Sequence, residues 1–188
     1  SSYGMVPIDL STDEVDFIMA SAQKGIMAMT GLSFVIGRRS VLEASKDYPM
    51  HGYYTNLYLQ YSFLRDHGEM HFTPPVQTVY AAVQGVKEYF AEGEQAKFAR
   101  HRAVYEALRD GAVALGFKPT LQKEYESGLV VSLIYPDDPA WDFERVHDYC
   151  YERGFTIYPG KLVTRKAFRL CSLGAIVPQD VADFFVVF

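Results

Sequence analysis

One lysine, Lys24, stands out because of the residues on either side of it. An apolar run with strand character, 15–19, precedes it, and a second apolar run, 32–37, follows it. A lysine between two buried strands loses part of its hydration, which favours the neutral, nucleophilic amine. The chemistry that uses such an amine most often is Schiff-base formation with a carbonyl, above all with pyridoxal 5'-phosphate (PLP). The same spacing also fits a surface lysine at a strand end, with its ammonium group in water.

Four short segments then occur in an order that resembles one enzyme family. They are the lysine segment, a Thr-Pro-Pro element, a Tyr-Pro-Gly-Lys element and an Arg-Leu-Cys-Ser element, at 19–26, 71–75, 154–161 and 168–174. Together they resemble class V, fold type I PLP-dependent aminotransferases, with similarity through essentially the whole chain. Within that class they are most similar to the branch that acts on 2-aminoethylphosphonate and pyruvate. The Tyr-Pro-Gly-Lys element is the most specific for this branch, whereas the lysine segment alone indicates only class V.

The resemblance implies roles for five residues. Lys24 would form the Schiff base with PLP and move the proton during amino transfer. Ser21 and Gln23 match positions that contact the cofactor phosphate, and Thr73 matches a threonine that reaches the phosphate of the partner subunit's cofactor. Arg169 matches the arginine that binds the acid group of the substrate. Each assignment has an ordinary alternative. Ser21 and Gln23 could simply be polar residues at a strand end, Thr73 a plain helix N-cap, and Arg169 one half of a surface ion pair.

The implied reaction moves the amino group of 2-aminoethylphosphonate to pyruvate and gives phosphonoacetaldehyde and L-alanine. Leu170, Cys171 and Ser172 stand where the family has small and amide residues, so the shape of the substrate stays open. An aminotransferase of the alanine–glyoxylate or serine–pyruvate type is one alternative. Another is a non-catalytic dimerisation fragment, because the resemblance places this chain in the C-terminal half of the family, without the N-terminal cofactor-binding half.

The composition and charge of the chain limit the kinds of partner that we expect it to bind. The chain has 188 residues, of which 49% are hydrophobic and 15% aromatic, enough for a substantial core. The formal net charge of −5 argues against nucleic acid or an anionic membrane as a partner. No apolar run is long enough to cross a bilayer, no signal peptide is recognisable, and the cysteines and histidines lack metal-ligand spacing. We therefore expect a cytoplasmic protein that binds a small amino donor and a 2-oxo acid, no metal, and a second copy of itself.

Two domains are expected to position these residues. Residues 1–93 would form the end of a large PLP-binding α/β domain, and 94–188 a small C-terminal α+β domain. Thr73 followed by two prolines predicts a helix that begins at Pro74 with Thr73 as its N-cap. An apolar stripe runs along the following residues to Phe90.

The remaining elements follow from periodicity and turn residues. A second helix is predicted from Glu94 to Leu115. After Gly128 the pattern predicts a strand, a helix, two strands and a last helix, which is an α+β layer. Cys150 falls on an apolar helical face, unlike the exposed nucleophile of a cysteine desulfurase. The tyrosine-rich stretch 39–71 either covers a partner subunit or packs its rings locally.

Overall fold

The computed structural model describes residues 1–160, 162 and 164–188, and it divides into two compact units. The first unit consists of Ser1 and Pro7–Ala91, and the second of Ser2–Val6 and Glu92–Phe188. The assignment of a cofactor-binding and a small domain to either side of Gly93 stays a prediction. Lys161, the last residue of the Tyr-Pro-Gly-Lys element, lies outside the described residues.

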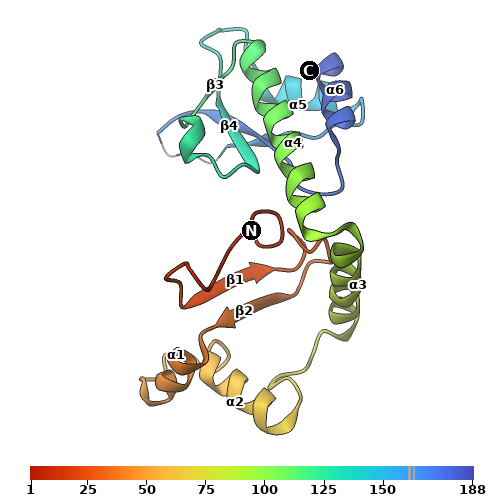
Figure 1. Cartoon of the computed structure of the whole chain (residues 1–188). Helices are drawn as coiled ribbons and strands as arrows, with labels where there is room; N and C mark the ends of the chain where they lie inside the picture. Colours follow the sequence, from red (N-terminus) through yellow and green to blue (C-terminus); the bar gives the residue numbers. More distant parts are fainter. Residues whose placement is uncertain (161, 163) are drawn as a thin grey trace. The chain divides into compact units, whose positions relative to one another are not determined.

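In the first unit, an antiparallel hairpin and one helix hold the segment that contains Lys24 (Figure 1). Strand β1 (Phe17–Ser21) pairs with β2 (Ser33–Gly37), and the connection between the two strands carries the lysine. Helix α3 (Val76–Glu92) approaches this connection at Gly85, where an added Cβ would lie 2.5 Å from the carbonyl oxygen of Ile26. Because any other side chain would collide there, a glycine is needed for the helix to pack on the connection.

The two strands are more exposed than their sequence predicts. Met19 is 75% exposed, Val35 40% and Ile36 37%. The expectation that two buried strands flank Lys24 is therefore wrong for this structure. The physical reason is that β1 and β2 form a two-stranded sheet, and no further strand of the described chain pairs with it.

Helix α3 begins later than expected and turns a different face inward. Its first residue is Val76, so the prediction that Thr73 is its N-cap is wrong. Proline disfavours the helical conformation in the residue before it, and Pro75 therefore prevents the helix from starting at Pro74. The predicted apolar stripe faces outward, with Phe90 75% exposed, while Gly85 is the buried residue of the helix.

Two shorter helices complete the first unit. Helix α1 (Arg39–Ala44) leads into a 3₁₀ turn (Ser45–Asp47), and α2 (Leu57–His67) follows. The side chain of Asn56 caps α2 by accepting the N–H of Leu59 at 3.0 Å. None of these segments has a buried residue.

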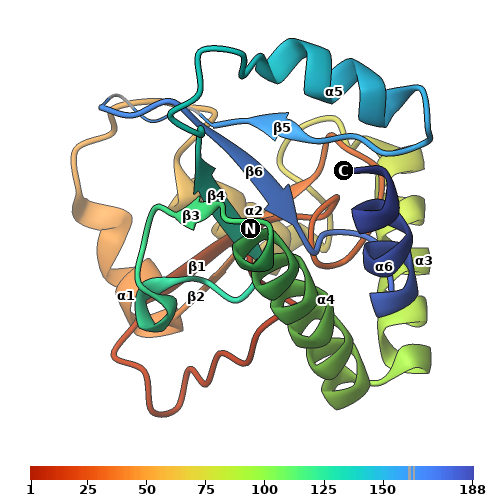
Figure 2. The ribbon, with the colours of Figure 1, turned by 90° about the horizontal axis from the view of Figure 1, so that it is seen from above.

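The second unit is a four-stranded antiparallel sheet with helices on one face (Figure 2). The strand order is β3-β4-β6-β5. The elements are β3 (Lys118–Pro119), β4 (Val130–Ile134), β5 (Tyr158–Pro159), β6 (Ala167–Cys171), α4 (Glu94–Ala114), a 3₁₀ turn (Lys123–Tyr125), α5 (Phe143–Tyr151) and α6 (Pro178–Val187).

One face of this sheet forms the core. Alternate residues of β4 and β6 point to the helices and are fully or almost fully buried: Val131, Leu133, Phe168 and Leu170. Helices α4, α5 and α6 cover them, among others with Leu108, Cys150 and Phe184. Burial raises the pKa of the Cys150 thiol, in keeping with the predicted structural role of this residue.

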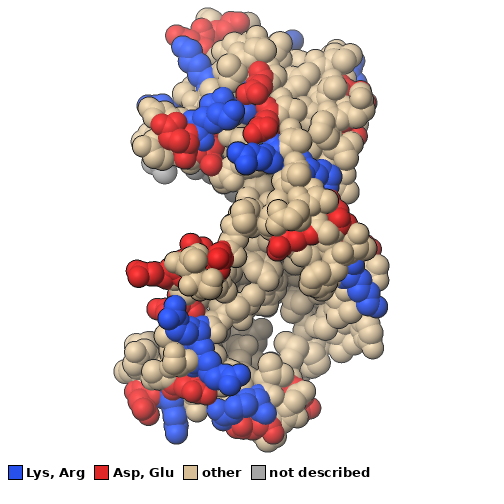
Figure 3. Space-filling view, viewed as in Figure 1, with Lys and Arg blue, Asp and Glu red and all other residues tan. Residues whose placement is uncertain are grey.

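Two features of the surface bear on partners. On the face shown in Figure 3, Lys and Arg side chains lie among Asp and Glu side chains. Within the described part of the chain, every helix is too short or too polar to cross a membrane.

Candidate functional site

The connection after β1 is a fixed turn. The backbone N–H of Ala22 donates to Leu32 O at 3.0 Å, and the N–H of Ala28 donates to Ala22 O at 3.0 Å. Ala22 and Ile26 are 1% and 7% exposed, so their buried side chains anchor the turn. The backbone N–H of Lys24 itself donates to Ser21 O at 3.2 Å, so the lysine is part of this hydrogen-bonded turn.

The polar side chains at this turn make few interactions with the described residues. Lys24 and Gln23 are half-buried, and among the described residues neither side chain makes a hydrogen bond or an ion pair. The hydroxyl of Ser21 lies 3.4 Å from that of Ser33, a long contact. A primary amine, an amide and a hydroxyl thus sit within four successive residues on a rigid support.

Thr73 belongs to the same unit and is exposed. Since it does not cap α3, its hydroxyl has no hydrogen-bond partner among the described residues. The segment before it is held in place by His71, whose Nε2 lies 3.1 Å from the hydroxyl of Tyr53 and whose ring meets Phe72 edge-on. The hydroxyl of Thr73 is therefore free to bind a ligand.

Arg169 lies in the second unit, on the sheet face that points away from the core. Its cross-strand neighbours are Ser132 on β4 and Tyr158 on β5. Side chains of directly opposed residues share one face of a sheet, so these two hydroxyls flank the arginine. The Nε of Arg169 is buried and has no acceptor among the described residues. An unpaired guanidinium donor is suited to an acidic ligand group.

Helix α4 supports the segment that follows Arg169. His101, 1% exposed, has its Nδ1 2.6 Å from the carbonyl oxygen of Ser172. Arg100 donates to the carbonyl oxygens of Gly174 and Ile176 at 3.0 and 3.2 Å. Two consecutive helix residues thus bind three backbone carbonyls of one loop.

Sequence reasoning found only part of this support. It predicted the helix that carries His101, and in the structure this histidine is buried, with no partner for its Nε2 among the described residues. It missed Arg100, whose other side forms an ion pair with Glu92 at 2.6 Å and lowers the pKa of that carboxyl group. The sequence did hold one signal. Arg100 and His101 are adjacent, both carry N–H donors, and both lie next to the apolar face of the helix.

The expected site residues thus fall into two groups. Ser21 ends β1, and Gln23 and Lys24 lie in the turn that follows it. Thr73 lies elsewhere in the same unit, and Arg169 belongs to the second unit. Each group has donors that are free to bind an anion or a carbonyl compound.

Comparisons with known proteins show which family the chain resembles. Residues 1–119 match the family model described as Aminotransferase class-V. The chain is 36% identical over 187 residues to 2-aminoethylphosphonate–pyruvate transaminase 2 of Burkholderia lata, with 97% of this chain and 50% of that protein covered. It is 35% identical to 2-aminoethylphosphonate–pyruvate transaminase of Phocaeicola vulgatus, with 96% and 50% covered. The chain spans about half the length of the curated relatives it matches.

Solved structures share the fold. An aspartate aminotransferase of subgroup IV from Thermus thermophilus has a TM-score of 0.83 at 24% identity, over 100% of this chain and 51% of that one. An alanine–glyoxylate aminotransferase from Nostoc sp. has a TM-score of 0.84 at 21% identity, over 97% and 49%. The α/β, fold type I architecture expected from the sequence is confirmed.

Proposed function

The chain belongs to the class V aminotransferase family, and on that premise we propose that it acts in a PLP-dependent transamination in which Lys24 holds the cofactor. The observation that carries this proposal is the fixed turn after β1, where the Lys24 amine is half-buried and unpaired among the described residues. A lysine already bound to a carboxylate would have to break that ion pair before it could react.

The residues of this turn fit PLP. The cofactor needs a primary amine for its aldehyde and neutral hydrogen-bond donors for its phosphate. Lys24 offers the amine, and Ser21 and Gln23 offer a hydroxyl and an amide. When bound, PLP supplies the aldehyde and a ring that draws electrons from the amine-bearing carbon of a substrate.

The protein's own groups have distinct tasks in this scheme. Lys24 holds the cofactor, and as a free amine it takes the proton from the amine-bearing carbon of the donor. Ser21 and Gln23 orient the phosphate. Arg169 binds the acid group of the substrate, with a planar guanidinium that pairs with carboxylate or phosphonate.

Thr73 suggests a homodimer. In this proposal its hydroxyl, which is exposed and unpaired among the described residues, donates to the phosphate of the cofactor held by a second protomer. Pro74 and Pro75 offer no backbone N–H, so the hydroxyl carries most of this contact. Dimerisation would then be a condition for tight cofactor binding.

We assign 2-aminoethylphosphonate as amino donor and pyruvate as acceptor. The support is the name shared by relatives that are 34–36% identical over nearly the whole of this chain. Products are phosphonoacetaldehyde and L-alanine. The departures at Leu170, Cys171 and Ser172 make the donor the part of the assignment that most needs a direct assay.

The assay compares amino donors on the purified protein with PLP. Alanine formation from 2-aminoethylphosphonate and pyruvate is measured beside serine with pyruvate and alanine with glyoxylate, with Lys24→Ala as the inactive control. We expect the phosphonate donor to have the highest kcat/KM. A higher value for serine or alanine would transfer the assignment to a serine–pyruvate or alanine–glyoxylate type. No turnover with any donor would favour the non-catalytic dimerisation module.

A further inference from the structure

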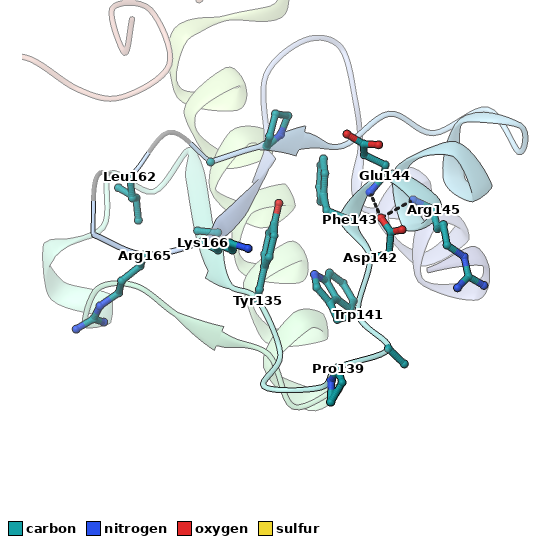
Figure 4. Close-up of a pocket in the computed structure, with 14 residues that line it drawn as sticks. Tyr135, Pro139, Trp141, Asp142, Phe143, Glu144, Arg145, Leu162, Arg165 and Lys166 are labelled. Atoms are coloured by element: carbon teal, nitrogen blue, oxygen red, sulfur yellow. Dashed lines mark hydrogen bonds between the residues drawn. The ribbon is translucent and has the colours of Figure 1, made fainter.

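A cavity of about 780 Å³ opens at one end of the second-unit sheet, where β4 ends and β6 begins (Figure 4). Its volume is within the range of small-molecule sites, which is roughly 300–1,000 Å³. Neither Lys24, Thr73 nor Arg169 lines it. The cavity is therefore separate from the residues to which the proposed transamination assigns a role.

One wall of the cavity is aromatic. The rings of Tyr135 and Phe143 lie nearly parallel, with centroids 5.7 Å apart and an interplanar angle of 11°. The indole of Trp141 lies 5.8 Å from the Tyr135 ring. All three residues line the cavity, so they offer an apolar surface to a flat ligand.

Positive charge borders this wall. Lys166, Arg165 and Arg145 line the cavity and are exposed, and none of them forms an ion pair with a residue that the structure describes. The backbone N–H of Tyr135 donates to Lys166 O at 3.1 Å, which holds the backbone of Lys166 next to Tyr135. Figure 4 shows the Lys166 side chain extending toward Tyr135, while the two arginines extend outward.

The acidic residues of the lining do not cancel this charge. The carboxylate of Asp142 caps α5 and accepts the N–H groups of Glu144 and Arg145 at 2.9 and 3.3 Å. In Figure 4 the carboxylate of Glu144 points away from Lys166. Three basic side chains thus face two carboxylates among the described lining residues, so the formal charge of this lining is positive.

From the juxtaposition of an unpaired lysine and an aromatic wall we propose that this cavity binds a small aromatic carboxylate. The ring of the ligand lies against Tyr135, Trp141 and Phe143, and its carboxylate pairs with the ammonium group of Lys166. The two arginines raise the positive potential at the rim and favour the approach of an anion.

The position of Trp141 gives a direct test, because it is the one tryptophan in the sequence. Tryptophan fluorescence of the protein is followed during titration with benzoate and, separately, with benzamide, its uncharged analogue. We expect a saturable change with benzoate and none with benzamide at the same concentrations. Calorimetry of the same titrations provides a second readout of binding.

Three variants test whether benzoate binds in this cavity rather than elsewhere on the protein. Lys166→Gln should weaken benzoate binding about tenfold, the usual effect of losing a charge-assisted hydrogen bond. Lys118→Gln, at an exposed lysine of β3 outside the cavity, should leave it unchanged. Arg169→Gln should also leave it unchanged. Equal responses to benzoate and benzamide, no saturation, an unaltered Lys166→Gln titration, or loss of binding in Arg169→Gln would each overturn the proposal.

Discussion

The Nδ1 atom of His101 lies 2.6 Å from the carbonyl oxygen of Ser172. Because a carbonyl oxygen can only accept, Nδ1 carries the proton of the neutral ring. This bond joins the middle of α4 to the residue that follows β6, the strand of Arg169. A buried histidine therefore holds the start of the loop that follows the strand of Arg169.

The first prediction concerns the pH dependence of this bond. Burial lowers the pKa of His101 below its ordinary value, so the folded state binds a proton less readily than the unfolded chain. The stability that the neutral His101 contributes is fully present above the pKa of the unfolded chain, about 6.5. It is lost as the pH falls toward the lower pKa of the folded state.

The test is urea unfolding between about pH 7.5 and pH 5. The free energy of unfolding should fall over this range in the unmodified protein. The part due to His101 should be missing in His101→Gln, which can still donate to Ser172 but does not titrate. Identical pH profiles for the two proteins would show that His101 is not the responsible group.

The second prediction concerns the contact between α3 and the lysine turn. In Gly85→Ala the new methyl group would meet the carbonyl oxygen of Ile26 at 2.5 Å, so the helix or the turn must shift. We expect a loss of roughly 1–3 kcal/mol in the free energy of unfolding, as for other overpacked sites. Gln84→Ala, at the exposed neighbouring position, should cost less than about 0.5 kcal/mol. A Gly85→Ala variant as stable as this control would contradict the close approach.

The third prediction contrasts a buried with an exposed ion pair. The Glu126 side chain is 3% exposed and accepts from Arg109 at 2.7 Å and from the hydroxyl of Tyr105. Glu126→Ala would leave the guanidinium, 15% exposed, without this partner, and we expect a loss of about 3 kcal/mol. Arg102→Ala breaks an exposed pair with Glu106 and should cost less than about 0.5 kcal/mol. Chemical denaturation measures the free energy of unfolding of both variants. Equal losses would contradict the expected difference between the buried and the exposed ion pair.

The fourth prediction concerns Thr73. If its hydroxyl donates to the cofactor phosphate, Thr73→Val should raise the Kd of PLP about tenfold, because a hydrogen bond to a charged group is lost. The exposed Thr12 provides a matched control, and Thr12→Val should bind PLP normally. Equilibrium dialysis with PLP gives both constants, and analytical ultracentrifugation measures the oligomeric state of both variants. Unchanged PLP affinity in Thr73→Val would remove this residue from the cofactor site.

Helix α4 shows what periodicity predicts well. The predicted extent, Glu94 to Leu115, agrees with the observed helix within one residue, since local sequence controls both the apolar stripe and the end, where Gly116 has a φ of 89°. Helix α3 shows the limit. Its apolar stripe was visible, but the buried side is set by how closely Gly85 can approach Ile26, and that contact joins residues far apart in the sequence.

The candidate site divides in the same way. Short motifs, which need no tertiary information, predict Lys24 as the residue that binds the cofactor and Arg169 as the residue that binds the substrate. The contacts of Arg100 and His101 with the loop after Arg169 could not be found in this way, since they arise only when α4 packs against the sheet. Strand β3, two residues long, was missed because so short a strand is specified by its pairing with β4.

The central claim is that the amine of Lys24 is the group that holds PLP. The most direct measurement is to incubate the protein with PLP, reduce it with borohydride, digest it and locate the phosphopyridoxyl group by mass spectrometry. We predict a single stoichiometric label on Lys24, absent from Lys24→Ala and from a sample without borohydride. Labelling spread over exposed lysines such as Lys118, and equal in Lys24→Ala, would contradict the account.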